Sequence, residues 1–361
     1  MNILVDAHVF DNGLQGTTSY IKNLYNIIVD FPNIQITLCA NDINNLKNIF
    51  TNEKFKFITL KTKSKIWRLF YEFPRIIKKE KFDFAHFQYI VPMKKECIYI
   101  NTIHDILFLD FPDYFNLFYR ITKRFLFKLS AKKSDIIFTV SQFSKNCIAE
   151  TFSIPKDKIH ILPNAVQVSK ISSIDVKEKY GIRNFIHYVA RFEPRKNQIG
   201  LLKAYLNSDL PNNYDLVFIG RKKDKIEKKY YEKFVRTIPS DKKKNIHIFE
   251  SLSDEELIAF YKQSSCFVYP SFAEGFGIPP IEAGVNCCKV LCSNQTAMAD
   301  FDFFKYTFNP NNENELQQKI LEVLNDNEYP FENTKNEIMK KYNLNDIASY
   351  FYNIIAGKND S

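Results

Sequence analysis

The sequence predicts an α/β protein in which two doubly wound parallel-sheet domains face each other across a cleft. Short apolar segments alternate with amphipathic helical patterns along nearly the whole chain, as is typical of parallel sheets whose strands are joined by helices. A polar stretch at residues 167–174 separates two such series. The length of 361 residues also favours two domains, and a hydrophobic content of 45% is sufficient for two cores.

Each series of apolar segments accounts for one sheet. Seven strands are expected in the first series, at residues 2–6, 34–39, 55–60, 84–87, 97–102, 136–140 and 159–162. Five are expected in the second, at residues 185–190, 215–219, 245–249, 266–269 and 290–293, before a helical tail. We therefore place the domains at residues 1–170 and 171–343, with a ligand between them at the carboxyl ends of both sheets.

Residues 274–282, with the sequence EGFGIPPIE, place two carboxylates eight positions apart around a glycine-rich bend. Gly275 and Gly277 permit a tight turn whose amides can approach a ligand, and the two prolines suit the first turn of a helix. We expect Glu282 in that first turn, where the helix dipole favours an ionised carboxylate that can accept hydrogen bonds from a ribose diol. Glu274 is expected on the loop, free to meet a sugar hydroxyl. An ordinary loop before a helix would look the same in isolation.

A second pattern supplies fixed positive charge. The expected strand at residues 185–190 is followed by Arg191, and Lys196 is expected to open the next helix. The carboxyl end of a parallel strand is the usual ligand crevice, and a helix N-terminus adds oriented amides, so this junction suits a diphosphate. A solvated charge cluster is the alternative. A third, weaker pattern is the loop at residues 13–16 after the first strand, where Gly16 can bring backbone amides close to a phosphate.

These segments resemble the nucleotide-sugar glycosyltransferases of family 4, which have the GT-B fold. Further matching segments lie at residues 102–105, 139–145, 162–165 and 253–257, in the family's order and spacing. The likeness is strongest to the bacterial mannosyltransferase-like branch that builds surface polysaccharides. Residues 283–290 depart from the family pattern, which usually has a Gly-x-Pro turn there. The resemblance also implies that a C-terminal helix at residues 344–361 crosses back to the first domain.

The resemblance assigns roles to individual residues. It implies a retaining hexosyl transfer in which His104 contacts the donor sugar, Glu274 orients that sugar, and Glu282 holds the ribose. The residues expected to act in catalysis are His104, Arg191, Lys196 and Glu274. Those expected to bind the donor are Gly16, Arg191, Lys196, Gly275, Phe276, Gly277 and Glu282. The donor is expected to be GDP-mannose, or otherwise a UDP-sugar, and the acceptor a lipid-linked saccharide of O-antigen or capsule synthesis.

The chain is expected to use neither a metal nor a cofactor. No Asp-x-Asp pair stands in the expected cleft, so we infer that Arg191 and Lys196 replace a divalent ion in stabilising the departing nucleoside diphosphate. Seven cysteines without CxxC or Cys/His spacing indicate reduced thiols in a cytosolic protein. No apolar run approaches the roughly eighteen residues that a membrane span requires.

The net charge of +9 is unevenly placed. Residues 1–168 carry 23 basic and 15 acidic side chains, whereas the remainder carries 27 and 26. Much of the excess lies in residues 61–81 and 120–133, where basic residues are mixed with aromatic ones. Such segments suit an anionic membrane surface, although two amphipathic helices with solvated lysines would have the same composition. Nucleic acid is not expected as a partner, because no recognised binding module accompanies the charge.

Two other functions fit the same residues less well. A nucleotide-sugar 2-epimerase would use the same diphosphate contacts but would need acid and base carboxylates in the first domain. A non-catalytic sugar-nucleotide-binding protein is disfavoured because Arg191, Lys196, Glu274 and Glu282 are all present.

Overall fold

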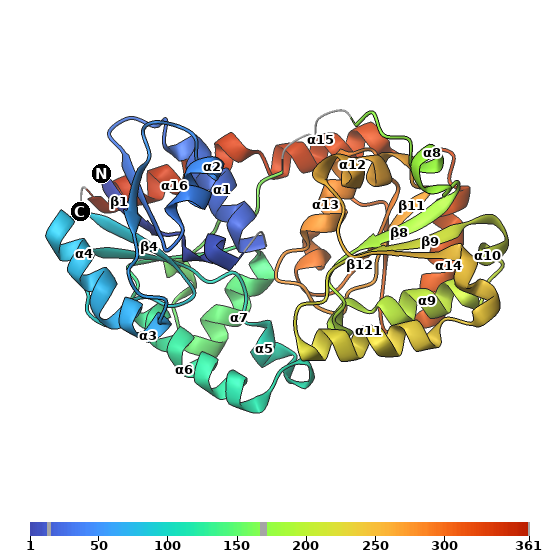
Figure 1. The fold of residues 1–361 in the computed structure, drawn as a ribbon, viewed down its shortest axis with the longest axis horizontal. Helices are drawn as coiled ribbons and strands as arrows, with labels where there is room; N and C mark the ends of the chain where they lie inside the picture. The colour runs from blue at the N-terminus through green and yellow to red at the C-terminus, as the bar shows by residue number, and fades with distance from the viewer. Residues whose placement is uncertain (13–15, 167–171, 360–361) are drawn as a thin grey trace. The chain divides into compact units, whose positions relative to one another are not determined.

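The computed structural model describes residues 1–12, 16–166 and 172–359, and the chain forms two compact units (Figure 1). Unit 1 comprises Met1–Ala165 and Tyr342–Ser361, and unit 2 comprises Val166–Lys341. Each unit has a parallel sheet with helices on both faces, which confirms the expected fold class. The boundary expected at residue 170 lies outside the described residues.

The sheet of unit 1 has seven parallel strands in the order β3-β2-β1-β4-β5-β6-β7. The strands are β1 (Asn2–Asp6), β2 (Gln35–Ala40), β3 (Lys56–Thr59), β4 (Phe84–Gln88), β5 (Ile98–Thr102), β6 (Ile136–Thr139) and β7 (Ile159–Ile161). The helices are α1 (Gly16–Ile28), α2 (Ile43–Ile49), α3 (Lys65–Trp67), α4 (Phe73–Glu80), α5 (Leu107–Asp110), α6 (Leu117–Lys133), α7 (Gln142–Phe152) and α16 (Leu344–Asn359). Strand β4 is buried along its whole length, as expected for a strand covered on both faces.

The sheet of unit 2 has six parallel strands in the order β10-β9-β8-β11-β12-β13. The strands are β8 (Phe185–Val189), β9 (Asp215–Ile219), β10 (Ile246–Phe249), β11 (Cys266–Tyr269), β12 (Val290–Ser293) and β13 (Tyr306–Phe308). The helices are α8 (Val176–Tyr180), α9 (Gln198–Leu206), α10 (Leu210–Asn213), α11 (Lys225–Thr237), α12 (Asp254–Gln263), α13 (Ile278–Val285), α14 (Glu313–Asn325) and α15 (Phe331–Lys341). The sequence did not predict β13, because three residues are too few to establish an apolar pattern.

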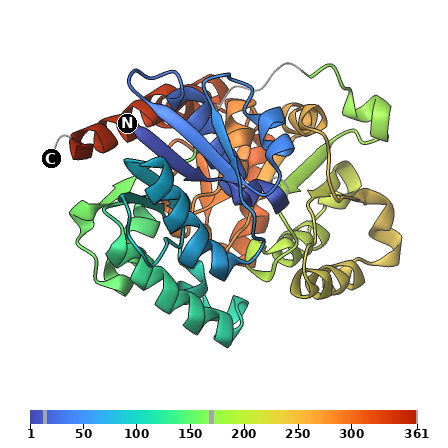
Figure 2. The same ribbon diagram turned by 60° about the vertical axis from the view of Figure 1, so that its left-hand side comes forward.

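The C-terminal helix α16 belongs to unit 1, where it packs against α1 (Figure 2). Phe351 of α16 is fully buried, and its ring lies 5.1 Å from that of Phe138 and 6.1 Å from that of Tyr25. The helix therefore completes the core of unit 1 with residues that follow unit 2 in the sequence.

Both sheets contain a point at which the order of the strands reverses. In unit 1 the chain proceeds outward from β1 through β2 to β3 and then returns to the other side of β1 with β4. In unit 2 it proceeds outward from β8 through β9 to β10 and then returns with β11. The loops at the carboxyl ends of two such strands diverge and leave a crevice, which is where doubly wound sheets bind ligands. In unit 2 the loops after β8 and β11 lie on either side of this reversal.

Candidate active site

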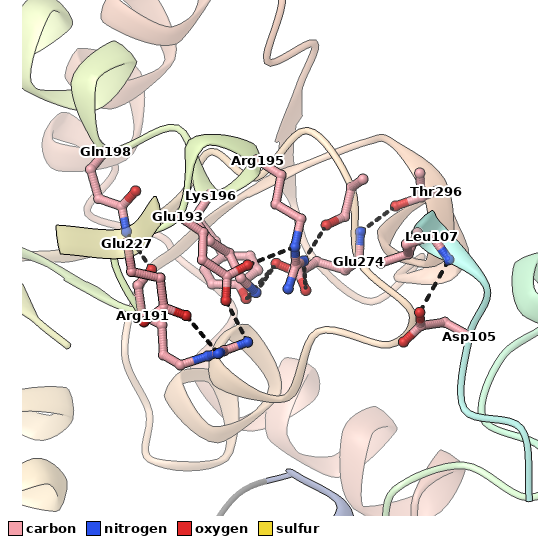
Figure 3. A network of polar contacts seen from close by, with 12 residues as sticks. Asp105, Leu107, Arg191, Glu193, Arg195, Lys196, Gln198, Glu227, Glu274 and Thr296 are labelled. Atoms are coloured by element: carbon pink, nitrogen blue, oxygen red, sulfur yellow. Dashed lines mark hydrogen bonds and ion pairs between the residues drawn. The ribbon is translucent and has the colours of Figure 1, made fainter. Parts of the chain in front are cut away.

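The loop after β8 and the loop after β11 meet through a network of ion pairs in unit 2 (Figure 3). Arg191, two residues beyond β8, is half-exposed and forms ion pairs with Glu193 and Glu227. The distance from Arg191 Nη1 to Glu227 Oε1 is 2.7 Å. Arg195 Nε lies 2.8 Å from the second oxygen of Glu193, so that carboxylate links the two arginines. The strand-to-helix junction is therefore fixed by charge as well as by backbone.

Lys196 and Glu274 form the buried part of the network. The Lys196 ammonium donates to Glu274 Oε1 at 2.5 Å and to the Tyr269 hydroxyl at 3.3 Å. Arg195 Nη1 contacts the other Glu274 oxygen at 3.2 Å. Burial raises the pKa of Glu274, but the charges of Lys196 and Arg195 outweigh it and lower that pKa to about 2. Glu274 is therefore ionised at neutral pH. Burial and the charge of Arg195 lower the pKa of Lys196, and the charge of Glu274 opposes that fall.

These contacts correct two expectations about the same residues. Glu274 is not free on its loop, because two cations 78 and 79 residues away in sequence bind its carboxylate. Lys196 does not open the next helix but ends the 3-10 turn Pro194–Lys196. Asn197 is the N-cap of α9, with a φ of 57° and a side chain that accepts a hydrogen bond from the Gly200 amide at 3.2 Å. That cap fixes the turn that carries Lys196.

Helix α13 begins earlier than the sequence suggested, and this changes the position of Glu282. The helix starts at Ile278, immediately after Gly277, whose φ is 98°. A Cβ at Gly277 would lie 3.3 Å from Met298 and Phe301, so a larger residue would be strained in both backbone and packing. Ile-Pro-Pro-Ile therefore fills the first turn, and Glu282 lies in the second turn, contrary to expectation. Burial raises the pKa of Glu282, which accepts a hydrogen bond from the Tyr261 hydroxyl at 3.2 Å.

The remaining predicted residues of this loop are part of the core of unit 2. Gly275 is buried, and Phe276 is 7% exposed with its ring edge-on to that of Phe301 at 6.1 Å. The Glu274 amide donates to Thr296 Oγ1 at 2.9 Å, which ties the loop to the segment after β12. The glycine-rich bend is thus held rigidly on both sides.

His104 and Gly16 lie in unit 1. His104 follows β5 and is buried, with its Nε2 2.8 Å from Gln88 Oε1 and its ring 5.0 Å from that of Tyr20. Tyr20 belongs to α1, which begins at the exposed Gly16. The rest of the glycine loop, residues 13–15, lies outside the described residues. Burial lowers the pKa of His104 to about 4, so its imidazole is neutral at pH 7.

Several polar residues of the network were not assigned a role from the sequence. Glu193 and Arg195 lie in the same segment as Arg191 and Lys196, and their charges could have indicated that they belong to the site. Glu227 of α11 and Tyr269 of β11 gave no such signal, because only folding brings them to the loop after β8. Among the described residues, no three His, Cys, Asp or Glu side chains lie together in a way that could hold a metal ion.

Buried histidines should make the protein sensitive to acid. Burial lowers the pKa of His86 to about 3, of His104 to about 4 and of His187 to about 3. The unfolded chain binds protons at these residues below pH 6.5 and the folded protein does not, so stability falls as pH falls through 6.5 toward 4. Each histidine contributes up to about 1.4 kcal/mol per pH unit. The free energy of unfolding, measured with denaturant at pH 7, 6 and 5, should show this slope. The substitution His104→Gln should reduce the slope by the contribution of one histidine. An unchanged slope would mean that His104 is protonated when folded.

Comparisons with known proteins place the chain in a family. The architecture is that of GT-B sugar transferases, and two family models match successive parts of the chain. The model for glycosyltransferase family 4 covers residues 33–170, and the model for glycosyl transferases group 1 covers residues 170–343. The chain belongs to glycosyltransferase family 4 and, within it, resembles the mannosyltransferase-like branch.

Individual relatives agree with this family. The chain is 31% identical to the O-antigen chain mannosyltransferase RfbU of Salmonella typhimurium, over 54% of this chain and 51% of RfbU. It is 30% identical to the O-antigen chain mannosyltransferase B of Escherichia coli, over 64% of this chain and 62% of that protein. The chain thus matches between half and two thirds of the length of these two relatives.

Solved structures agree on the fold. Sucrose-phosphate synthase from Thermosynechococcus elongatus superposes with a TM-score of 0.80 at 15% identity, covering 99% of this chain and 98% of that one. HepE from Anabaena, in complex with UDP and glucose, superposes with a TM-score of 0.78 at 14% identity. The match covers 99% of this chain and 100% of HepE. None of the helices in the described parts of this chain has the length and apolar character that a membrane span needs.

Proposed function

We propose that this protein is a retaining, metal-independent hexosyltransferase that moves mannose from GDP-mannose, or otherwise a hexose from a UDP-sugar, onto a saccharide acceptor of O-antigen or capsule synthesis. The observation that carries the proposal is the network of Arg191, Lys196 and Glu274 at the strand-order reversal of unit 2. The O-antigen mannosyltransferases among its relatives support mannose as the sugar.

The network suits stabilisation of a departing nucleoside diphosphate. Negative charge develops on this leaving group in the transition state, and preorganised cations stabilise it without having to reorient. Lys196 is preorganised, because Glu274 and Tyr269 fix its ammonium. Arg191 is half-exposed, and Glu193 and Glu227 hold its guanidinium at the end of β8. A diphosphate at this crevice would exchange carboxylate contacts of Arg191 for phosphate contacts of similar geometry.

The other predicted residues have supporting roles in the proposal. Glu274 orients the sugar while holding Lys196, and Glu282 accepts hydrogen bonds from the ribose. Gly277 and the amides beside it allow the donor to approach the start of α13. From unit 1, the neutral imidazole of His104 contacts the hexose, and amides near Gly16 contact the phosphate.

A panel of donors tests this function directly. The purified protein is incubated with GDP-mannose, UDP-glucose, UDP-galactose and UDP-N-acetylglucosamine, and release of the nucleoside diphosphate is followed with and without excess EDTA. We expect slow hydrolysis of GDP-mannose at the same rate in both conditions, because side-chain cations act on the leaving group. Strict dependence on added magnesium or manganese would contradict the assignment to Arg191 and Lys196. Absence of hydrolysis with every donor would contradict the proposed function.

We further propose that the acceptor is met at an anionic membrane surface. We call the basic residues of segment 61–81 and the apolar residues beside them the interfacial patch. Four of its apolar residues are 50–68% exposed, namely Ile66, Trp67, Phe70 and Tyr71. The alternative of aromatics packed inside amphipathic helices describes Phe73, which is fully buried, but not Trp67, Phe70 and Tyr71. Helix α6 adds Leu117, Phe118, Ile121 and Phe125, which are 61–76% exposed. Clustered exposed apolar side chains mixed with lysines suit a lipid headgroup region.

Vesicle binding tests the interfacial patch. Anionic vesicles should recruit the protein in a salt-sensitive way, at about 1 kcal/mol for each engaged lysine or arginine, and neutral vesicles should recruit it poorly. Sedimentation with vesicles is compared for two variants that lose the same charge. Replacing the exposed Lys61, Lys63, Lys78, Lys79 and Lys81 with glutamine should abolish binding. Replacing the exposed unit 2 lysines Lys225, Lys228, Lys229, Lys233 and Lys243 should not. Equal loss in both variants would show that only net charge matters.

A further inference from the structure

His104 belongs to a group of buried polar side chains in unit 1. His86 and Gln88 are two residues apart on β4, and Thr102 pairs with Gln88 from β5, so these side chains lie on one face of the sheet. His104 follows two residues after Thr102. All four residues are at most 8% exposed. Their polar atoms therefore depend on one another, rather than on water, for hydrogen bonds.

The hydrogen bonds of this group connect the two imidazole rings. The side-chain oxygen of Gln88 lies 2.8 Å from His104 Nε2, and its amide nitrogen lies 3.3 Å from His86 Nε2. His86 Nε2 is also 2.8 Å from the Thr102 hydroxyl, and His86 Nδ1 is 2.6 Å from the Tyr25 hydroxyl. One glutamine side chain thus bridges His86 and His104.

The amide of Gln88 distinguishes the two rings, because its oxygen can only accept a hydrogen bond and its nitrogen can only donate one. The oxygen faces His104, so Nε2 of that ring carries a proton. The nitrogen faces His86, so Nε2 of that ring is unprotonated. Burial lowers the pKa of His104 to about 4 and that of His86 to about 3, so each ring holds one proton at pH 7. It follows that Nδ1 is unprotonated in His104 and protonated in His86.

Two tyrosines hold the ring of His104 in place. The ring of Tyr20 lies edge-on at 5.0 Å, and that of Tyr89 lies at 5.4 Å. Tyr89 directly follows Gln88, and consecutive side chains of an extended strand would point to opposite faces. The φ of Tyr89 is 66°, a left-handed conformation that is uncommon for an aromatic residue, and both Gln88 and Tyr89 contact the same ring. Backbone strain of this kind is concentrated at functional sites.

We propose that Gln88 is a positioning residue that fixes His104 in the Nε2–H tautomer, so that Nδ1 accepts a hydrogen bond from a hydroxyl group of the donor hexose. The inference rests on the proposed function, in which His104 contacts the hexose, and it adds the direction of that contact. Among the described residues, Nδ1 of His104 has no hydrogen-bond partner. The bond that one ring nitrogen makes decides the protonation of the other. A deoxy position cannot donate to Nδ1, so the contact selects a sugar with a hydroxyl there.

Nuclear magnetic resonance of the full chain, labelled with ¹⁵N at histidine, reads the tautomers directly through long-range ¹H–¹⁵N correlations at pH 7. The signals of His86 and His104 are identified by their loss in His86→Gln and His104→Gln. We expect a proton on Nε2 of His104 and on Nδ1 of His86, because the Gln88 amide lies between the rings. In Gln88→Met, the Nε2 proton of His104 should exchange faster with water, because its acceptor is lost. A proton on Nε2 of both rings, or on Nδ1 of His104, would overturn the proposal.

Donor hydrolysis tests whether Gln88 acts through His104. With GDP-mannose, or the UDP-sugar that the wild type hydrolyses fastest, Gln88→Met should lower kcat/KM about tenfold, the loss expected for one misplaced hydrogen bond. In a protein that already carries His104→Gln, adding Gln88→Met should change kcat/KM by less than about twofold, since no ring is left to position. The matched control is Tyr99→Phe, which removes the buried hydrogen bond from the Tyr99 hydroxyl to the Lys94 carbonyl near the other end of β5. It should leave kcat/KM within about twofold of the wild type.

The outcomes separate this inference from the proposed function. A loss in Gln88→Met that persists in the His104→Gln background would show that Gln88 supports the fold of unit 1 rather than His104. An unchanged kcat/KM in Gln88→Met would also overturn the proposal. If Gln88→Met does not fold, the tautomers of the wild type still decide whether the amide fixes the ring. Absence of hydrolysis of every donor by the wild type, with the expected tautomers, would instead reject the proposed function.

Discussion

Lys196→Ala should reduce turnover by roughly two decades or more, which is the usual effect of removing one preorganised donor from a developing negative charge. The Lys196 ammonium is fixed by Glu274 and Tyr269, so the substitution removes a cation that is already oriented. Arg191→Ala should have an effect of the same order, although its greater exposure allows solvent to replace part of the lost charge. Steady-state release of the nucleoside diphosphate by each variant measures both effects.

Helix α9 offers a matched control for Lys196. Lys203 is also paired with a glutamate, Glu313, at 3.1 Å, but both side chains are about half exposed. Lys203→Ala should leave turnover and the midpoint of thermal unfolding nearly unchanged, since exposed ion pairs contribute about 0–1 kcal/mol. Near-normal turnover in a folded Lys196→Ala variant would move the phosphate site away from the loop after β8.

Glu274→Gln should have the largest effect on stability. The substitution leaves Lys196 buried without its carboxylate, and removing one partner of a buried ion pair costs about 3–5 kcal/mol. For a unit of this size that corresponds to a fall in the unfolding midpoint of roughly 6–20 °C. Calorimetry of the variant beside Glu313→Gln, the exposed counterpart, separates this effect from loss of a surface charge.

The pH dependence of the Glu274→Gln effect provides an independent check. The pKa of Glu274 is lowered from 4.5 to about 2 on folding, so its ionised form stabilises the protein fully above pH 4.5. That stabilisation is lost as pH falls from 4.5 toward 2, and the difference between wild type and variant should shrink over this range. A difference in stability that is constant from pH 7 to pH 3 would show that packing, rather than charge, makes Glu274 important.

Local sequence patterns predicted both sheets and the segments that carry the candidate site. Apolar segments of four to six residues between helical patterns predicted every strand but β13, because burial on both faces requires continuous apolar runs. The motif at residues 274–282 and the Arg191 and Lys196 junction identified the family. The backbone conformation of Gly277 is also predictable from the local sequence, since a tight bend with a φ of 98° favours glycine.

The pairing of the charges depends on contacts between residues far apart in the sequence. Glu274 binds Lys196, 78 residues away, and Glu227 binds Arg191, 36 residues away. A side chain's charge is fixed by its type, but its partner and its removal from water depend on which loops meet at the edge of a sheet. The order in which strands join that sheet is a long-range property, and local patterns do not encode it.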